Sequence, residues 1–233
     1  MTGLRLDSIS LSQIDPDNCW FSPGCALCIY KPDAGEKILR LLNHYFGTVK
    51  LHSICCHHDP QLPAGATIIN NCAGCDRRFR SLYEGVQTIS LWEVLAGLPE
   101  LPLPQYPGLT LSVHDSCSYR LKPQVHTAVR DLLHKMGITI IESQFSGTES
   151  ICCGDNFYNR IPLEDVHAFQ NKRAAQMPCQ DVAVYCVSCI KSMTIGGKTA
   201  HHMADLLLGE RTDPQETDLV KYHDALERYI DAH

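Results

Sequence analysis

The sequence predicts an α/β protein built from two similar halves, each with a parallel β-sheet flanked by helices. Three observations lead to this prediction: cysteines recur twice in the same order, runs of strand composition alternate with helical periodicity, and prolines cluster near the middle of the chain. An internal repeat decides the architecture, and strands that alternate with helices are typical of parallel sheets. We therefore expect the cysteines at the carboxyl ends of the strands.

The composition is that of an ordinary globular protein. Of the 233 residues, 44% are hydrophobic and 20% are charged, and the net charge is -6. This balance gives no reason to expect nucleic acid or an anionic membrane as a partner. We expect no membrane span, because no run approaches the roughly eighteen apolar residues that one requires. Residues 1–17 lack the apolar run of a signal peptide, so we expect a cytoplasmic location.

Thirteen cysteines are far more than packing requires, because a core accepts alanine as readily as cysteine. A single cysteine, an adjacent pair and a Cys-x-x-Cys motif follow one another in each half. These ten cysteines are Cys25, Cys55, Cys56, Cys72, Cys75, Cys117, Cys152, Cys153, Cys186 and Cys189. Fifteen residues separate Cys56 from Cys72, whereas thirty-two separate Cys153 from Cys186. The first copy therefore lacks about one helix.

The first half contains three runs of strand composition, each of which leads into a cysteine motif. They cover residues 20–25, 48–54 and 66–70. Asp33 and Glu36 predict a capping box at the start of a helix, and Gly47 ends that helix. Another helix is expected to begin near Asp76.

Four prolines between Leu98 and Gly108 interrupt regular structure and mark the boundary between the halves. We accordingly place the first domain at 18–104 and the second at 105–233. Expected strands of the second half cover 109–114, 138–142 and 181–185. Expected helices cover 125–136 and 163–176, followed by two terminal helices at 200–208 and 219–230.

This topology predicts where the thiols meet. In an open parallel sheet, the loops at the carboxyl ends of the strands form one crevice in which ligands bind. In a reducing compartment, clustered thiols bind a soft metal or a cluster more often than they form disulfides. A zinc site needs four ligands and leaves the fifth thiol of each set unexplained, and the usual cubane iron-sulfur cluster also needs only four.

The motifs HDSC, ICCG and CVSC resemble the cysteine-rich CCG domain, which occurs twice in the catalytic subunit of heterodisulfide reductase and also in many anaerobic Fe-S oxidoreductases. The resemblance covers about residues 18–208. His114 and Asp115 fall where this family often has His-Asp before its first cysteine. The first half departs from the pattern, since it is shorter and His57 replaces the glycine after the cysteine pair. We identify 18–104 as a shortened CCG repeat and 105–233 as a second repeat with C-terminal helices.

The resemblance implies that each five-cysteine set holds a non-cubane 4Fe-4S cluster, made from two fused 2Fe-2S rhombs with one bridging thiolate. The chain would then carry two such clusters and act as an oxidoreductase that reduces a small disulfide or oxidises thiols. Its electrons would come from a ferredoxin, an Fe-S subunit or a flavoprotein. We expect neither NAD nor flavin in this chain, because the GxGxxG signature is absent.

Two other functions remain open at this point. The chain could be a non-catalytic electron-transfer subunit, comparable to the CCG-containing components of lactate- or glycerol-3-phosphate-oxidising dehydrogenase complexes. It could also be a zinc-stabilised interaction module with one closed site in each half.

Polar residues beside the thiols are further candidates. His57, His58 and His114 are candidate proton donors to a departing thiolate, with a purely structural hydrogen-bonding role as the alternative. Arg77 and Arg78 are candidates for binding an anionic group of the substrate, with a solvated helix start as the alternative.

Three cysteines lie outside the repeated order. Cys19 and Cys179 have the character of small filling residues. Cys28 also fits that description, but it lies close enough to the first set to be a substitute ligand.

Overall fold

A computed structural model describes residues 9–233, which divide into two compact units. Of the described residues, unit 1 contains 9–99 and 225–233, and unit 2 contains 100–224. The first boundary lies inside the proline-rich stretch. The C-terminal residues 225–233 belong to unit 1, although the sequence alone places them with the second half.

Unit 1 contains a four-stranded sheet in which every pair of neighbouring strands is parallel. The strands are β1 Cys19–Ser22, β2 Lys50–Leu51, β3 Thr67–Asn70 and β4 Gln87–Ser90, in the order β2-β1-β3-β4. The helices are α1 Cys25–Tyr30, α2 Pro32–Phe46, α3 Ala73–Leu82 and α4 Leu91–Gly97, with short 3-10 turns at Leu11–Gln13 and Pro16–Asn18. All four residues of β3 are buried, as expected for a central strand of a parallel sheet covered on both faces.

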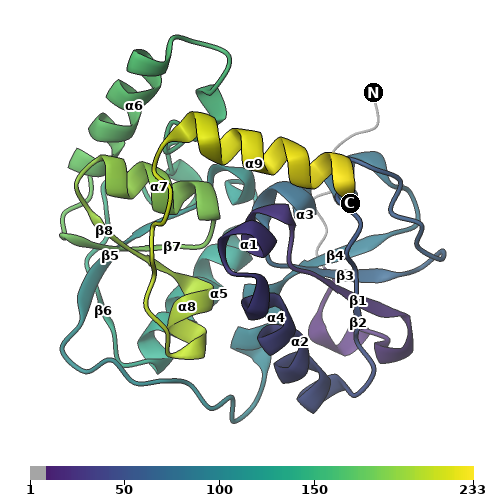
Figure 1. Ribbon diagram of the computed structural model, residues 1–233. Coiled ribbons are helices and arrows are strands. Elements are labelled where there is room, and N and C mark those ends of the chain that lie inside the picture. The colour runs from purple at the N-terminus through teal and green to yellow at the C-terminus, as the bar shows by residue number, and fades with distance from the viewer. Residues whose placement is uncertain (1–8) are drawn as a thin grey trace. The chain divides into compact units, whose positions relative to one another are not determined.

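Unit 2 has a sheet of the same order, β6-β5-β7-β8, which is also parallel throughout. Its strands are β5 Thr110–His114, β6 Thr139–Ile140, β7 Asp181–Val184 and β8 Thr199–His202. Its helices are α5 Pro123–Lys135, α6 Leu163–Ala175, α7 Val187–Ile195 and α8 Met203–Leu208, with 3-10 turns at Cys117–Tyr119, Gly147–Glu149 and Asp155–Phe157. Helix α9 Leu219–Ala232 begins in unit 2 and ends in unit 1. The predicted α/β class with parallel sheets is confirmed (Figure 1).

The units differ between the cysteine pair and the Cys-x-x-Cys motif. In unit 2 the segment between Cys153 and Cys186 contains α6, which packs against α7 (Figure 1). In unit 1 the corresponding segment between Cys56 and Cys72 contains β3 but no helix. The missing helix is thus the one that the sequence spacing predicts.

Some local predictions were wrong. Helix α2 begins at Pro32 with Lys31 as its N-cap, so Asp33 and Glu36 do not form a capping box, and Asp33 instead pairs with Lys37 one turn later. Proline suits this first helical position because the N–H that it lacks would have no partner there. Residues 200–202 were expected in a helix but lie in β8, and strand β4 was not predicted.

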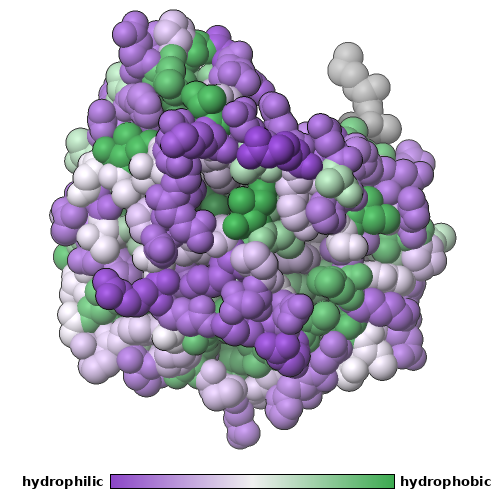
Figure 2. Space-filling view, in the orientation of Figure 1, coloured by the Kyte–Doolittle hydropathy of each residue, from purple (hydrophilic) through white to green (hydrophobic). Residues whose placement is uncertain are grey.

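The face drawn in Figure 2 is mostly hydrophilic, with hydrophobic residues in separate patches. Within residues 9–233, none of the helices combines the length and the apolar character that crossing a membrane would require.

The order of the strands decides where a ligand site forms. From β1 the chain moves to β2 on one side, then returns to β3 on the other, so a topological switch point lies between β1 and β3. Loops at the carboxyl ends of these two strands diverge and leave a crevice. Cys25 begins α1 after β1, and Cys72 immediately precedes α3 after β3. In unit 2 the same switch point lies between β5 and β7.

Candidate functional site

The five thiols of unit 2 lie together as one chain of contacts. Cys117 is within hydrogen-bonding range of Cys152, which contacts Cys153. Cys153 in turn contacts Cys189, and Cys189 contacts Cys186. Residues that are far apart in the sequence therefore surround one position at the carboxyl ends of β5 and β7.

Unit 1 repeats this arrangement with its own five thiols. Cys25 contacts Cys55, which contacts Cys56. Cys56 contacts Cys75, and Cys75 contacts Cys72. In both units the first, second, third, fifth and fourth cysteines of the motif follow one another in space. All ten cysteines that the sequence selects are thus brought into two groups of five.

Ionisation of one thiol in each group opposes ionisation of its neighbours. Hydrogen bonds from Cys25 and Cys56 lower the pKa of Cys55 to about 2, while the hydrogen bond with Cys55 raises the pKa of Cys25 well above its usual value. Likewise, hydrogen bonds from Cys117 and Cys153 lower the pKa of Cys152 to about 2. Five thiolates so close together would repel one another unless a cation lay among them.

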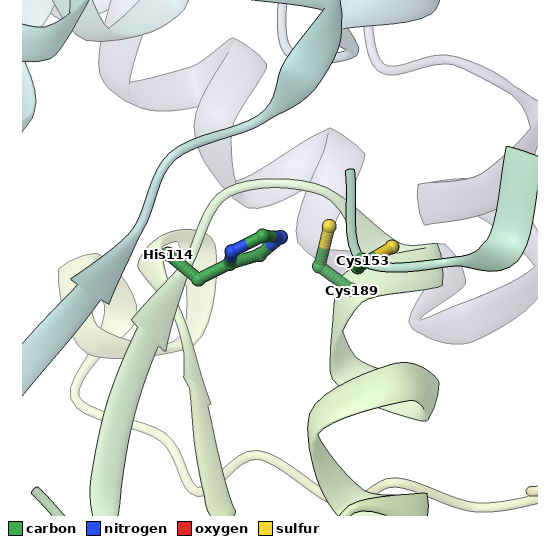
Figure 3. A group of neighbouring side chains, drawn as sticks. All are labelled: His114, Cys153 and Cys189. Atoms are coloured by element: carbon green, nitrogen blue, oxygen red, sulfur yellow. The ribbon is translucent and has the colours of Figure 1, made fainter. Parts of the chain in front are cut away.

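The donor set fits a metal ion or a metal-sulfur cluster bound by thiolates. Sulfur is a soft ligand that suits iron-sulfur clusters and zinc. In unit 1 four of the five thiols line one pocket, so they border a cavity that protein atoms do not fill. They are Cys25, Cys55, Cys56 and Cys75. In unit 2 the sulfurs of Cys153 and Cys189 and a ring nitrogen of His114 all lie within 4.8 Å of one another (Figure 3).

Gly24 allows the Cys-x-x-Cys motif of unit 1 to approach the end of β1. Its φ is 78°, and a Cβ built there would lie 2.9 Å from Cβ of Cys72 and 3.3 Å from Sγ of Cys75. Only glycine adopts this backbone conformation readily and leaves room for the two cysteines.

The cysteine pair of unit 1 is held by α3 and the residue that follows it. Arg78 donates from Nε to the carbonyl oxygen of Cys56 over 3.1 Å. The Tyr83 hydroxyl donates to the carbonyl oxygens of Cys56 at 3.3 Å and of His58 at 2.6 Å. These bonds tie the loop after β2 to α3, which carries Cys75.

In unit 2 the buried carboxylate of Asp115 has the same organising role. Arg130 donates to both of its oxygens, at 3.0 and 2.9 Å, and the Tyr185 hydroxyl donates to Oδ1 at 2.8 Å. The backbone N–H of Gly147 donates to Oδ2 at 2.6 Å, and Ser150 Oγ donates to the Asp115 carbonyl at 2.7 Å. Although burial alone would raise its pKa, Arg130 holds the pKa of Asp115 below its usual value. Asp115 thus joins the loop of Cys117 to the loop that leads to Cys152.

Gly154 follows the cysteine pair of unit 2 and fixes the turn after it. Its backbone N–H donates to Sγ of Cys152 over 3.4 Å, and its φ is 108°. A Cβ at this position would lie 3.0 Å from Cγ and 3.2 Å from the backbone nitrogen of Gln170 on α6. The glycine therefore permits both the turn and the close approach of the helix.

His114 and Arg173 lie immediately behind the thiols of unit 2. Arg173 Nε donates to Nδ1 of His114 over 3.1 Å, and both side chains are buried. Burial and the guanidinium of Arg173 lower the pKa of His114 to about 3, so its ring is neutral. The sequence identifies His114 but not Arg130, Tyr185 or Arg173, since no local motif marks residues that reach the site from other elements.

The remaining candidate side chains of unit 1 lie at the edge of the thiol group. His57 is exposed beside Cys55, and partial burial lowers its pKa. His58 Nε2 lies 2.7 Å from the carbonyl oxygen of Ile230, so it has a structural hydrogen bond. Arg77 is exposed, whereas Arg78 is partly buried and bound to Cys56.

The three cysteines outside the pattern are not members of either contact chain. Cys19 is fully buried in β1, where burial raises its pKa to about 12. Cys179 lies before β7 and its backbone N–H donates to Ser112 Oγ. Cys28 borders the pocket of unit 1 and is hydrogen-bonded to Tyr229, which lines the same pocket. All thirteen cysteines lie among the described residues, and none forms a disulfide.

Comparison with known proteins assigns no family to this chain, because neither a scan of protein-family models nor a search of curated proteins finds a match.

Proposed function

We propose that this chain is an Fe-S oxidoreductase that reduces a small disulfide, or oxidises the corresponding thiols, with one cluster held by five cysteines in each unit. The observation that carries the proposal is the pair of five-thiol groups with the same order of contacts, each at the switch point of a parallel sheet. The resemblance to the CCG domain supports a non-cubane 4Fe-4S type at both sites.

A fifth thiol in each group favours a cluster over zinc. Zinc in a structural site is satisfied by four ligands, which would leave an ionisable thiol buried against the ion without a role. In both units the third and fifth cysteines of the motif are buried, and in unit 1 Cys56 and Cys75 pack in a hydrophobic cluster with Ile68 and Phe79. A thiolate in such surroundings requires a bound cation.

The overall reaction balances as one disulfide, two electrons and two protons giving two thiols. The electrons come one at a time from a ferredoxin-like or flavoprotein partner, because this chain lacks a dinucleotide-binding signature. When bound, an iron-sulfur cluster supplies one-electron transfer at a soft, sulfur-binding centre.

The chain's own residues bind and orient the cluster ligands and deliver protons. Arg78 and Tyr83 hold the cysteine pair of unit 1, and Asp115 holds the corresponding loop of unit 2. His57 is the exposed titratable group beside Cys55, so it can exchange protons with solvent close to the thiols. Tyr229 lines the unit 1 pocket, where burial and Cys28 raise the pKa of its hydroxyl.

The proposal is tested by metal and acid-labile sulfide analysis of the full chain purified without oxygen. Two 4Fe-4S clusters predict about eight irons and about eight sulfides per chain. About two zinc ions and no sulfide would establish the zinc-stabilised module instead.

Substitution of single cysteines tests which thiols bind the clusters. Cys153→Ser should remove the cluster of unit 2, and with it about half of the iron, whereas Cys179→Ser is the matched control outside the contact chain. Equal iron content in both variants would contradict the assignment of Cys153 as a ligand.

Binding of substrate separates a catalytic from a relay function. If a disulfide or thiol binds at a cluster, adding it should change the EPR spectrum of the loaded chain. An unchanged spectrum, together with electron exchange with a partner protein, would instead identify an electron-transfer subunit of a dehydrogenase complex.

A further inference from the structure

His114 presents one ring nitrogen to an arginine and the other to the thiols of unit 2. Arg173 Nε donates to Nδ1 over 3.1 Å, and the two side chains are only 1% and 2% exposed. Figure 3 shows the ring directed from the end of β5 toward Cys153 and Cys189. The two contacts therefore lie on opposite sides of one imidazole.

The contact with Arg173 decides which nitrogen of His114 carries the proton. A guanidinium has only N–H donors, so Nδ1 must accept with its lone pair. In a neutral imidazole the hydrogen is then on Nε2. His114 thus offers an N–H to the thiol group and has no lone pair there with which to bind a metal.

The Nε2–H group of His114 lacks an acceptor among the described side chains and backbone atoms. Nε2 is buried, and a ring nitrogen of His114 lies within 4.8 Å of the sulfurs of Cys153 and Cys189, toward which Figure 3 shows the ring directed. A buried N–H without an acceptor costs free energy, so such groups are rare in native proteins. A sulfur atom of a cluster bound by these cysteines would accept the hydrogen bond from His114 Nε2–H.

Arg173 brings a buried positive charge whose hydrogen-bond partners are neutral. Its guanidinium donates to the Gln176 side-chain oxygen at 3.0 Å and to the Phe145 carbonyl oxygen at 2.8 Å, besides His114. Within residues 9–233 no ion pair joins Arg173 to a carboxylate, and nearby Asp115 is already paired with Arg130. A buried cation requires a compensating anion, and a thiolate-bound cluster is one.

Unit 1 has no histidine at the end of its first strand, and the arginine beside its thiols, Arg78, is only partly buried and donates to the Cys56 carbonyl oxygen. Ser22 ends β1 as His114 ends β5, each three residues before the first cysteine of its motif. Arg173 lies on α6, the helix that has no counterpart in unit 1. The buried charge next to the motif of unit 1 is instead the carboxylate of Asp76, which follows Cys75 and is paired with Arg80 at 2.9 Å.

We infer that His114 and Arg173 are positioning residues that hold the reduction potential of the unit 2 centre above that of the unit 1 centre. This inference rests on the proposed function, since it needs a redox-active cluster in each unit. Reduction adds negative charge to the cluster, and an N–H donor and a cation both stabilise that charge. The two centres therefore accept electrons unequally, and unit 2 is reduced first.

The test is an EPR-monitored redox titration of the loaded full chain. The signal that disappears in Cys153→Ser belongs to unit 2, and its midpoint should be higher than that of the other signal. His114→Ala and Arg173→Met should each lower the midpoint potential of the unit 2 centre. At a fixed applied potential, the ratio of reduced to oxidised centre should fall about tenfold, which corresponds to a shift in midpoint of about 59 mV for one electron. Arg173→Lys keeps the charge and should recover part of the loss. Ser22→Ala, at the corresponding place in unit 1, should leave the unit 2 signal unchanged.

If these variants lose their cluster, a measurement on the unaltered chain still tests the inference. With 15N-labelled histidine, pulsed EPR of reduced unit 2 should detect a weak nitrogen coupling together with an exchangeable proton, as expected for N–H···S contact. A strong coupling typical of an iron-bound nitrogen would overturn the inference, as would no coupling at all. Equal midpoints in the two units, with full iron content, would also overturn it, whereas absence of iron and sulfide would refute the proposed function itself.

Discussion

The backbone nitrogen of Gln170 lies 3.2 Å from the point that a Cβ would occupy at Gly154. Helix α6 therefore packs directly on the residue that follows the cysteine pair of unit 2. In unit 1 the chain forms no helix between the cysteine pair and Cys72, and the corresponding residue is His57, whose φ is not positive. The two units thus differ twice at this point: unit 2 has both the glycine and the helix that packs on it, and unit 1 has neither between its cysteine pair and Cys72.

Gly154→Ala should destabilise unit 2 and reduce its cluster content. The new methyl group combines a φ of 108° with close contacts to Gln170, and a strained residue of this kind costs about 1–3 kcal/mol. Thermal unfolding and iron analysis measure the two effects. His57→Gly is the matched change in unit 1 and should have a small effect, since the backbone there does not require a positive φ. Equal unfolding temperatures for Gly154→Ala and the unaltered chain would contradict this account.

Gly24→Ala should affect the other centre. A Cβ at Gly24 would lie 2.9 Å from Cβ of Cys72, and alanine does not readily adopt its φ of 78°. We expect about half of the iron to be lost, with the unit 2 EPR signal intact. Ser116→Ala, at the corresponding position of unit 2 and with an ordinary φ of -65°, should retain both signals. Loss of the unit 2 signal in Gly24→Ala would show that the glycine acts beyond its own unit.

Arg78→Gln should lower the occupancy of the unit 1 cluster without changing substrate affinity. The variant removes the shorter of two hydrogen bonds to the Cys56 carbonyl and leaves the bond from Tyr83 at 3.3 Å; a hydrogen bond that involves a charged group contributes about 1.5–3 kcal/mol. Arg77→Gln is the exposed neighbouring control and should keep full occupancy. Iron content and the KM for a disulfide substrate distinguish the roles: a raised KM with full iron would indicate that Arg78 binds substrate.

The metal-free chain should lose stability as the pH falls below about 6.5, the usual pKa of histidine. Burial lowers the pKa of His126 in the folded state, with smaller opposing effects of nearby charges. The unfolded chain then binds the proton more readily, so stability is complete above pH about 6.5 and declines toward the folded pKa, by at most about 1.4 kcal/mol per pH unit for this group. Urea unfolding at several pH values should show a smaller slope in His126→Gln, while His134→Gln, exposed on the same helix, should keep it.

Alkylation followed by mass spectrometry should separate ligand from non-ligand cysteines. In the loaded chain we expect the partly exposed Cys28 and Cys179 to react, because metal-bound thiolates are protected. Removing iron with an oxidant and a chelator should expose five further partly exposed thiols, namely Cys25, Cys72, Cys117, Cys152 and Cys186. Rapid reaction of these five before iron removal would argue against a bound centre in either unit.

The sequence by itself determined the class of the fold and the identity of the thiols. Its alternation of strand and helix predicted parallel sheets, and the cysteine order selected the ten thiols that the fold gathers, because periodicity and spacing are local properties of the chain. The unequal spacings also predicted the absence of a helix in unit 1. The capping box predicted at Asp33 was wrong, because Pro32 starts that helix at a position that suits proline and Lys31 is the N-cap.

Only the tertiary structure decided which residues surround the thiols. Arg130 and Tyr185 lie 15 and 70 positions from Asp115 in the sequence, yet both bind its carboxylate, and Arg173 reaches His114 from another element entirely. Hydrogen bonds between such distant residues leave no periodic signal, since they depend on how β5, α5, α6 and β7 pack. The same packing buries Arg173 beside the thiols of unit 2 and leaves Arg78, beside those of unit 1, only partly buried, so the difference between the two thiol groups is a property of the folded chain.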